Sequence, residues 1–97
     1  MVTAAVRRLH PDSELVARMA SQDEAALNEL LARHERTAYA VAIAICTDAV
    51  RAERAVSAAF LDAFREAARF VPGELTVLAW LTCLTRRRAE AIAATRI

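Results

Sequence analysis

Apolar residues recur along most of the chain with the 3.6-residue period of an α-helix. The clearest stripe extends over about five turns, and its members are Leu27, Leu30, Leu31, His34, Ala38, Val41, Ala42 and Ile45. Beyond Thr37 the opposite side of this segment is apolar as well, so we expect its second half to be the most buried part of the domain. The pattern changes at Glu35-Arg36, which leaves a break in the helix open.

The chain divides into a lead-in over residues 1–11 and one helical domain over residues 12–97. Pro11 stops a helix from running through the lead-in, because proline has no backbone N–H to donate. Asp12 or Ser13 then caps a short first helix. A second start signal follows at Ser21-Gln22-Asp23-Glu24, where acidic residues again favour the first helical turn.

Two turns separate the remaining helices. Thr47-Asp48 ends the second helix and starts a third, which runs to about Phe70. Val71-Pro72-Gly73 is the clearest turn signal in the chain, and a last helix follows over about residues 74–95.

The third and last helices each have an apolar and a polar side. The apolar arc of the third contains Val56, Phe60, Ala63, Phe64 and Ala67, and its outer arc contains Arg51, Arg54, Ala58, Asp62, Arg65 and Arg69, with Leu61 beside it. The inward residues of the last helix are Val77, Trp80, Leu81, Leu84 and Ile92. Arg86 points away from that stripe, Arg87 lies on its flank, and Arg88 falls close to it.

The amino-acid composition favours helices and disfavours strands. The 97 residues include 24 alanines, one glycine and two prolines, and alanine is the strongest helix former and a poor strand former. Apolar residues make up 57% of the chain, which excludes a disordered polypeptide. We therefore expect an all-α protein, folded as a compact bundle of three to five helices.

The net charge and the cysteines indicate which partners and which cellular compartment to expect. The net charge of +1 gives no bulk attraction to nucleic acid, so any basic surface must be local. Cys46 and Cys83 lie in apolar surroundings, and we interpret both as buried thiols of a reducing compartment rather than a disulfide. No apolar run follows Arg7-Arg8, so we expect neither a signal peptide nor contact with a membrane, and a cytoplasmic location.

The sequence lacks a pattern typical of catalysis or metal binding. His34 lies in the apolar stripe, where we expect a half-buried imidazole bonded to a backbone carbonyl. His10 has no evident partner, and neither a Glu-x-x-His nor a His-Glu-x-x-His motif is present. We expect neither an enzyme nor a bound cofactor or metal.

Arg86-Arg87-Arg88 is the feature that most needs an explanation. Three adjacent arginines spread over about 200° of a helix and so cannot share one face. One interpretation is a solvated flank near the end of the helix, where cations are favoured. The other is a helix laid along DNA, with guanidinium groups on phosphates or on unpaired bases.

The order of several short motifs resembles region 2 of the extracytoplasmic-function sigma factors. The matching segments are Asp12-Ser13-Glu14-Leu15-Val16-Ala17-Arg18-Met19, Asp23-Glu24-Ala25-Ala26-Leu27, Arg36-Thr37-Ala38-Tyr39-Ala40, Ala52-Glu53, Phe60-Leu61-Asp62-Ala63-Phe64, Ala68-Arg69-Phe70-x-Pro72, Ala79-Trp80-Leu81 and Arg86-x-Arg88-Ala89. Together they cover about residues 12–92. The resemblance implies a sigma region 2-like helical domain that binds RNA polymerase core and opens promoter DNA at the −10 element.

The resemblance also implies where each partner binds. Docking on the coiled coil of the polymerase β′ subunit falls to Glu53, Arg54, Ser57, Ala58 and Leu61. Contact with the non-template strand of promoter DNA falls to Arg69, Phe70, Glu74, Thr76, Arg86, Arg87 and Arg88. We interpret Trp80 as a core aromatic that fixes the last helix rather than as a platform on which a base stacks.

The docking helix departs from the family pattern. Arg54 and Ala58 stand where the family usually has acidic residues, and Ser57 stands where it has glutamine. Because the β′ surface is basic, Arg54 should repel it. A second hypothesis is therefore a sigma-like interaction or regulatory module that has lost polymerase docking and binds an acidic protein partner or an anti-sigma factor. The acidity of the outer arc over residues 51–69 distinguishes the two.

Overall fold

The computed structural model describes residues 10–95, and the regular elements in this range are helices. These elements are α2 (Asp12–Ala20), α3 (Glu24–Cys46), α4 (Ala49–Glu66), the single 3₁₀ turn η1 (Ala67–Arg69) and α5 (Val77–Ala94). The predicted all-α bundle of three to five helices is confirmed. Most of the predicted lead-in, residues 1–9, lies outside the described residues, as does Arg96.

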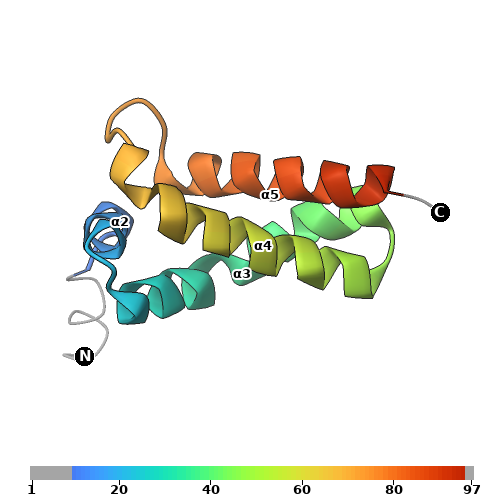
Figure 1. Cartoon of the computed structure of the whole chain (residues 1–97), viewed down its shortest axis with the longest axis horizontal. Helices are drawn as coiled ribbons and strands as arrows, with labels where there is room; N and C mark the ends of the chain where they lie inside the picture. The colour runs from blue at the N-terminus through green and yellow to red at the C-terminus, as the bar shows by residue number, and fades with distance from the viewer. Residues whose placement is uncertain (1–9, 96–97) are drawn as a thin grey trace, which may run out of the picture.

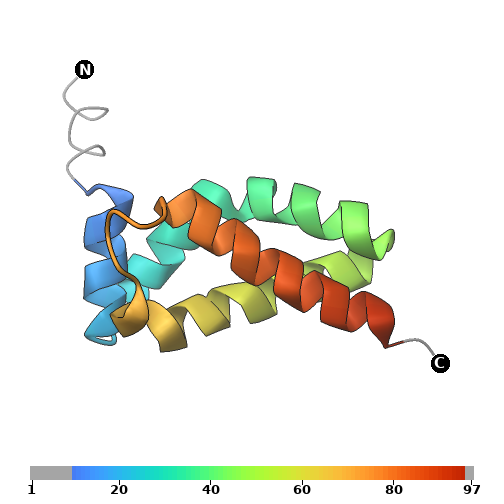
Figure 2. The ribbon, with the colours of Figure 1, turned by 90° about the horizontal axis from the view of Figure 1, so that it is seen from above.

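The three long helices form a bundle in which α3, α4 and α5 each contact the other two (Figure 1). The short helix α2 crosses one end of this bundle, where it packs against α3 and η1. Figure 2 shows that the connection between η1 and α5 lies at the same end of the molecule. This end therefore gathers the first helix and the longest described connection.

The corner between α2 and α3 is held by Asp23. Its carboxylate accepts backbone N–H bonds from Ala25 at 3.0 Å and Ala26 at 3.3 Å, so Asp23 is the residue of the predicted start signal that caps α3. Arg18 Nε donates to the same carboxylate at 2.9 Å. The Arg18 hydrogen bond, assisted by the two backbone N–H groups, lowers the pKa of Asp23 below its ordinary value. The Asp23 side chain thus caps α3 and also bonds Arg18 in the last turn of α2.

The prediction that Asp12 or Ser13 caps α2 is wrong. Pro11 occupies the N-cap position, and no side chain bonds the free N–H groups there. The Asp12 carboxylate instead accepts hydrogen bonds from His34 Nε2 at 2.7 Å and from Arg33 at 2.9 Å, both on α3. His34 is half-buried as expected, but its partner is this carboxylate rather than a backbone carbonyl. His10 has a partner as well, the Glu14 carboxylate at 3.1 Å.

Helix α3 is continuous across Glu35-Arg36, so the break that the pattern left open is absent. Its second half is not the most buried part of the domain, because Ala40 and Ala44 face solvent. The widest buried face belongs to α4, which packs against α3 on one side and α5 on the other. The apolar pattern of α3 was therefore a poor guide to which helix is central.

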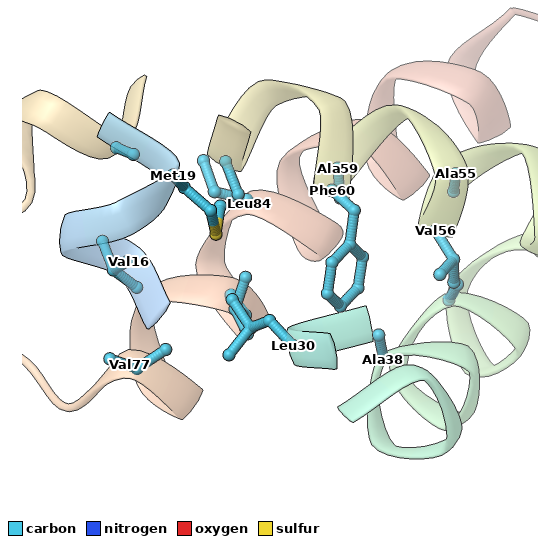
Figure 3. Packing of buried hydrophobic residues seen from close by; sticks show 14 of the residues in the cluster. Val16, Met19, Leu30, Ala38, Ala55, Val56, Ala59, Phe60, Val77 and Leu84 are labelled. Atoms are coloured by element: carbon cyan, nitrogen blue, oxygen red, sulfur yellow. The ribbon is translucent and has the colours of Figure 1, made fainter. Parts of the chain in front are cut away.

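The core contains many small side chains. Within residues 10–95, nine of the nineteen buried hydrophobic residues are alanines: Ala26, Ala38, Ala42, Ala52, Ala55, Ala59, Ala63, Ala67 and Ala89. Larger side chains fill the space between them. In Figure 3, Met19 of α2, Leu30 of α3 and Leu84 of α5 point toward one another, and the Phe60 ring of α4 points toward α3.

The ends of the last two long helices differ from the predicted ones. The α-helical part of α4 ends at Glu66, and the chain continues as η1 before it turns at Phe70. Helix α5 begins at Val77 rather than near residue 74, because the Thr76 hydroxyl accepts the N–H of Ala79 at 3.0 Å and so caps the helix. Residues 70–76 are therefore a longer connection than the turn signal alone predicts.

The two cysteines have different environments. Cys46 is buried, and its Sγ donates to the backbone carbonyl of Ala89 at 3.6 Å. Cys83 is exposed, so the prediction that it is buried is wrong: it lies on the side of α5 that faces solvent. Both thiols are free. Between residues 10 and 95, no helix has the length and apolar character needed to span a membrane.

Gln22 offers a test of backbone strain at the α2–α3 corner. Its φ of 70° is in the left-handed region, where any residue other than glycine has a strained backbone. Gln22→Gly should raise the free energy of unfolding by about 0.5–1 kcal/mol, measured by urea denaturation. Gln22→Ala keeps the strain and should change stability by less than about 0.5 kcal/mol. A loss of stability in the glycine variant would contradict this account.

Candidate functional site

The five residues predicted to dock on polymerase form one face of α4. Their spacing places them on consecutive turns of the same side of the helix, and they are Glu53, Arg54, Ser57, Ala58 and Leu61. Four are exposed and Ala58 is half-buried, so the face is open to a partner. Leu61 has 49% of its surface exposed, which is high for a large apolar side chain. We call these five residues the α4 outer face.

A groove runs between α3 and the α4 outer face. One part, of about 750 Å³, is lined by Leu31, Glu35, Arg36, Tyr39, Glu53, Val56 and Ser57. A smaller part, of about 250 Å³, is lined by Leu27, Asn28, Leu31, Ser57, Phe60 and Leu61. Both parts share Leu31 and Ser57, so they adjoin. The contribution of α3 to this surface was missed, although Leu27 and Leu31 belong to a stripe wider than the core requires.

The predicted DNA-contacting residues of the connection surround a small hollow. Arg69, Phe70, Val71, Glu74, Leu75 and Trp80 line this space of about 110 Å³. The rings of Phe70 and Trp80 are tilted at 46° with centroids 4.9 Å apart, a favourable aromatic pair. Both rings are partly buried and pack against the core. Trp80 therefore has the structural role expected of it, and it also forms one wall of the hollow.

Apolar side chains around the hollow were missed by sequence reasoning. Val71, Leu75 and Leu78 have 50%, 46% and 41% of their surfaces exposed. They surround the same connection as Arg69 and Glu74, which are also exposed. Thr76 differs from its predicted neighbours, because its hydroxyl already accepts the N–H that caps α5. The only signal for the apolar residues was their position on either side of the Pro72-Gly73 turn.

The three consecutive arginines of α5 have three different environments. Arg86 is exposed and forms no ion pair with any residue between 10 and 95. Arg87 has 60% of its side chain exposed and lies 3.2 Å from Glu66 Oε2. Arg88 donates to both carboxylate oxygens of Asp62, with Nε at 2.6 Å and Nη2 at 2.7 Å. Adjacent positions in the sequence are thus unpaired, loosely paired and tightly paired.

Asp62 is the buried member of this cluster. It was predicted to lie on the outer arc of the third helix, which is wrong, because α5 covers this side of α4 and leaves only 7% of the side chain exposed. The bidentate bond with Arg88 satisfies both carboxylate oxygens, as a buried charge requires. Arg88 was predicted to contact DNA, yet its guanidinium is held within the fold by this pair.

The arginines around Asp62 also set its ionisation. The hydrogen bond from Arg88 lowers the pKa of Asp62 below its ordinary value of 3.8, and the charges of Arg88, Arg87 and Arg65 act in the same direction against the effect of burial. The same pair raises the pKa of Arg88. Both groups are charged at neutral pH. A double hydrogen bond between ions therefore joins α4 to α5 near the middle of the bundle.

The arginines lie at a distance from the hollow. Trp80, which lines the hollow, precedes Arg86 by six residues, which corresponds to about 9 Å along the helix axis. The predicted DNA-contacting residues therefore form two groups, one around the connection and one on α5. The α4 outer face lies on a third surface, because α5 packs on another side of α4.

No model of a known protein family, no curated protein and no solved structure matches this chain. The resemblance to sigma factor region 2 thus rests on the short motifs and their order. Within residues 10–95, no group of three or more histidine, cysteine, aspartate or glutamate side chains is arranged to hold a metal ion.

Removal of the Asp62 carboxylate should destabilise the fold in a pH-dependent way. Asp62→Asn leaves Arg88 without its ionic partner and should lower the free energy of unfolding at neutral pH by about 1–3 kcal/mol. This is less than for a fully buried pair, because 41% of the Arg88 side chain is exposed to water. Urea denaturation between about pH 7 and pH 3 measures the effect.

The sign of the pH dependence follows from the lowered pKa of Asp62. Its contribution is complete above the ordinary value of 3.8 and is lost as the pH falls through the lower pKa of the folded state. The loss of stability in acid should be smaller in Asp62→Asn than in the unsubstituted protein. Glu53→Gln, at an exposed position of the same helix, is the control. Equal acid sensitivity of the two variants would contradict the assignment.

Proposed function

We propose that this chain is a sigma-factor-like module for transcription initiation, which binds RNA polymerase core and the −10 element of promoter DNA. The observation that carries the proposal is that the predicted docking residues and the predicted DNA-contacting residues lie on separate surfaces of the bundle. The predicted docking residues form one exposed face beside a groove, and the predicted DNA-contacting residues border an aromatic hollow or lie on α5. A module that bridges a protein and a DNA strand needs two such surfaces.

The hollow at the connection suits an unpaired base. Single-stranded nucleic acid is held by aromatic or apolar surfaces that contact bases, together with cations that contact phosphates. Phe70 supplies the aromatic surface, Trp80 supports the Phe70 ring from the core, and Arg69 lies beside them. Arg86 supplies a further cation along α5 without an acidic partner among the described residues. We propose that the non-template strand follows the connection and then α5.

The α4 outer face suits a protein surface better than a nucleic acid. Leu61 and the apolar side chains of the adjoining groove offer area to bury, and Glu53 offers an acidic group for a basic partner. Arg54 opposes such a partner by repulsion between like charges. Docking through this face would then be weak and adjustable by charge. Under this proposal, the protein acts in the cytoplasm, where polymerase is found.

One observation favours a second function, that of a regulatory module with an acidic protein partner. Arg54 and Arg69 are exposed and unpaired within residues 10–95, and Arg65 has 69% of its side chain exposed. These three cations on α4 and η1 would attract an acidic surface. The two functions require opposite charges on the partner of α4, so substitution of charges there separates them.

Reversal of charge on α4 should strengthen polymerase binding. Arg54→Asp with Ala58→Glu removes the repulsive cation and adds acidic groups, so binding to RNA polymerase core should tighten by about tenfold or more at low salt. Competition against a known sigma factor measures this change. Arg69→Asp with Ala68→Glu makes the same change in net charge on η1 and should leave core binding nearly unchanged. Equal effects of the two double substitutions, or weaker binding of the α4 variant, would contradict polymerase docking.

Loss of the unpaired arginine should weaken nucleic-acid binding. Arg86→Ala removes a cation available to phosphate, so the slope of log affinity against log salt for a single-stranded oligonucleotide should fall by about 0.7. Fluorescence anisotropy at several salt concentrations measures the slope. Arg54→Ala removes the same charge from α4 and should leave it unchanged. If the two variants behave alike, Arg86 is solvated surface.

A further inference from the structure

The side chains around Arg87 hold it less firmly than they hold Arg88. Arg87 Nη2 is 3.2 Å from Glu66 Oε2 and 3.9 Å from the nearer oxygen of Asp62. Only one of these distances is that of a hydrogen bond, whereas Arg88 makes two short ones. The Asp62 carboxylate is also saturated by Arg88. Glu66 is thus the main partner of Arg87.

The two arginine pairs differ in how easily a competitor can replace them. The Arg88 pair includes a carboxylate that is almost completely buried, so opening it would leave an uncompensated charge inside the fold. The Arg87 pair is open to water, with 60% of the arginine side chain and 33% of the glutamate side chain exposed. Exposed pairs of this kind stabilise a protein very little. A phosphate can therefore compete with Glu66 for Arg87 but not with Asp62 for Arg88.

We propose that Glu66 masks Arg87 and so limits the cationic charge that α5 offers to a nucleic-acid phosphate. This inference rests on the proposed binding of single-stranded DNA. In the free protein, Arg86 is the member of the cluster without an acidic partner among the described residues. A bound strand recruits Arg87 by displacing Glu66, and Arg88 keeps α5 attached to α4 meanwhile. The Glu66 side chain weakens binding and thereby limits how long the strand is held.

The masking residue and the arginine that it pairs with come from two different helices, α4 and α5. Glu66 is the last α-helical residue of α4, and Arg87 lies on the flank of α5 that faces it. Because Glu66 lies on α4 and Arg87 on α5, a substitution of Glu66 leaves the local structure of α5 unaltered. Glu66 also lies one residue before η1, which leads to the connection and its hollow. Only η1 separates Glu66, the partner of Arg87, from the connection that borders the proposed base site.

Removal of the mask should strengthen binding to DNA. Glu66→Gln keeps the size of the side chain and removes its charge, so affinity for a single-stranded oligonucleotide at low salt should rise about threefold to fivefold. The slope of log affinity against log salt should steepen by up to about 0.7, because one more arginine becomes available to phosphate. Fluorescence anisotropy of the full chain at several salt concentrations measures both quantities.

Two comparisons separate masking from a general effect of charge. Glu24→Gln makes the same change in net charge at an exposed position outside both proposed surfaces, and it should not reproduce the gain. In a background that carries Arg87→Ala, Glu66→Gln should give no gain, because the masked cation is absent. Thermal unfolding of each variant checks that the fold is kept.

The outcomes distinguish this inference from the proposed function. A gain in Glu66→Gln that exceeds that in Glu24→Gln and disappears without Arg87 supports the mask. If the unsubstituted protein binds the oligonucleotide and the two glutamine variants behave alike, the mask is wrong and the proposed DNA binding stands. If neither the unsubstituted protein nor Glu66→Gln binds, the mask and the proposed DNA binding both fail. Binding of an acidic peptide in place of the oligonucleotide, strengthened by Glu66→Gln, would assign the same cations to a protein partner and overturn the mask on DNA binding.

Discussion

The bundle depends on close packing through the alanine side of α4. Ala52, Ala55, Ala59 and Ala63 are each completely buried and repeat along the helix at the spacing of one inward face. Side chains this short let neighbouring helices approach closely, and α4 meets both α3 and α5 in this way. The position of α4 determines where the other features lie. Its outer face and the adjoining groove lie on one side of the helix, and its ion pairs with α5 lie on another. A larger side chain on the alanine face would separate surfaces that the proposed function requires together.

Much of the fold follows from the sequence because helical periodicity and helix-start signals are local. The apolar stripe of α3, the cap at Asp23 and the turn after Phe70 needed no knowledge of neighbouring helices. Predictions that depended on tertiary contacts failed. Asp12 has a side chain suited to a cap, but Pro11 takes the N-cap position, and the Asp12 carboxylate instead accepts hydrogen bonds from His34 and Arg33 of another helix. Burial of α3 was overestimated for a similar reason, since an apolar side remains exposed when no helix covers it.

The candidate site was predictable as a set of residues but not as an arrangement. The resemblance grouped Glu53, Ser57 and Leu61 as docking residues, and they are exposed on α4. Helical periodicity could not show that α5 covers Asp62, because a helix packed on two sides buries more than its apolar arc. A usable signal was present: Arg88 falls close to the apolar stripe of its own helix, and a charge in that position needs an opposite charge nearby. Such a misfit on one helix indicates a partner of opposite charge on a neighbouring helix.

The connection over residues 70–76 has a consequence for how such a protein could diversify. Val71 through Thr76 are all exposed, and the connection contacts the core through Phe70, whose ring rests on Trp80. Gly73 adopts a φ of 98° with no atom within 4 Å of where a Cβ would be, so backbone conformation rather than crowding restricts that position. Insertions, deletions and exchanges between Phe70 and Thr76 would leave the helices in register. Selectivity for a ligand could thus change from one descendant to another while the scaffold stays the same, which makes this stretch the evolvable part of the molecule.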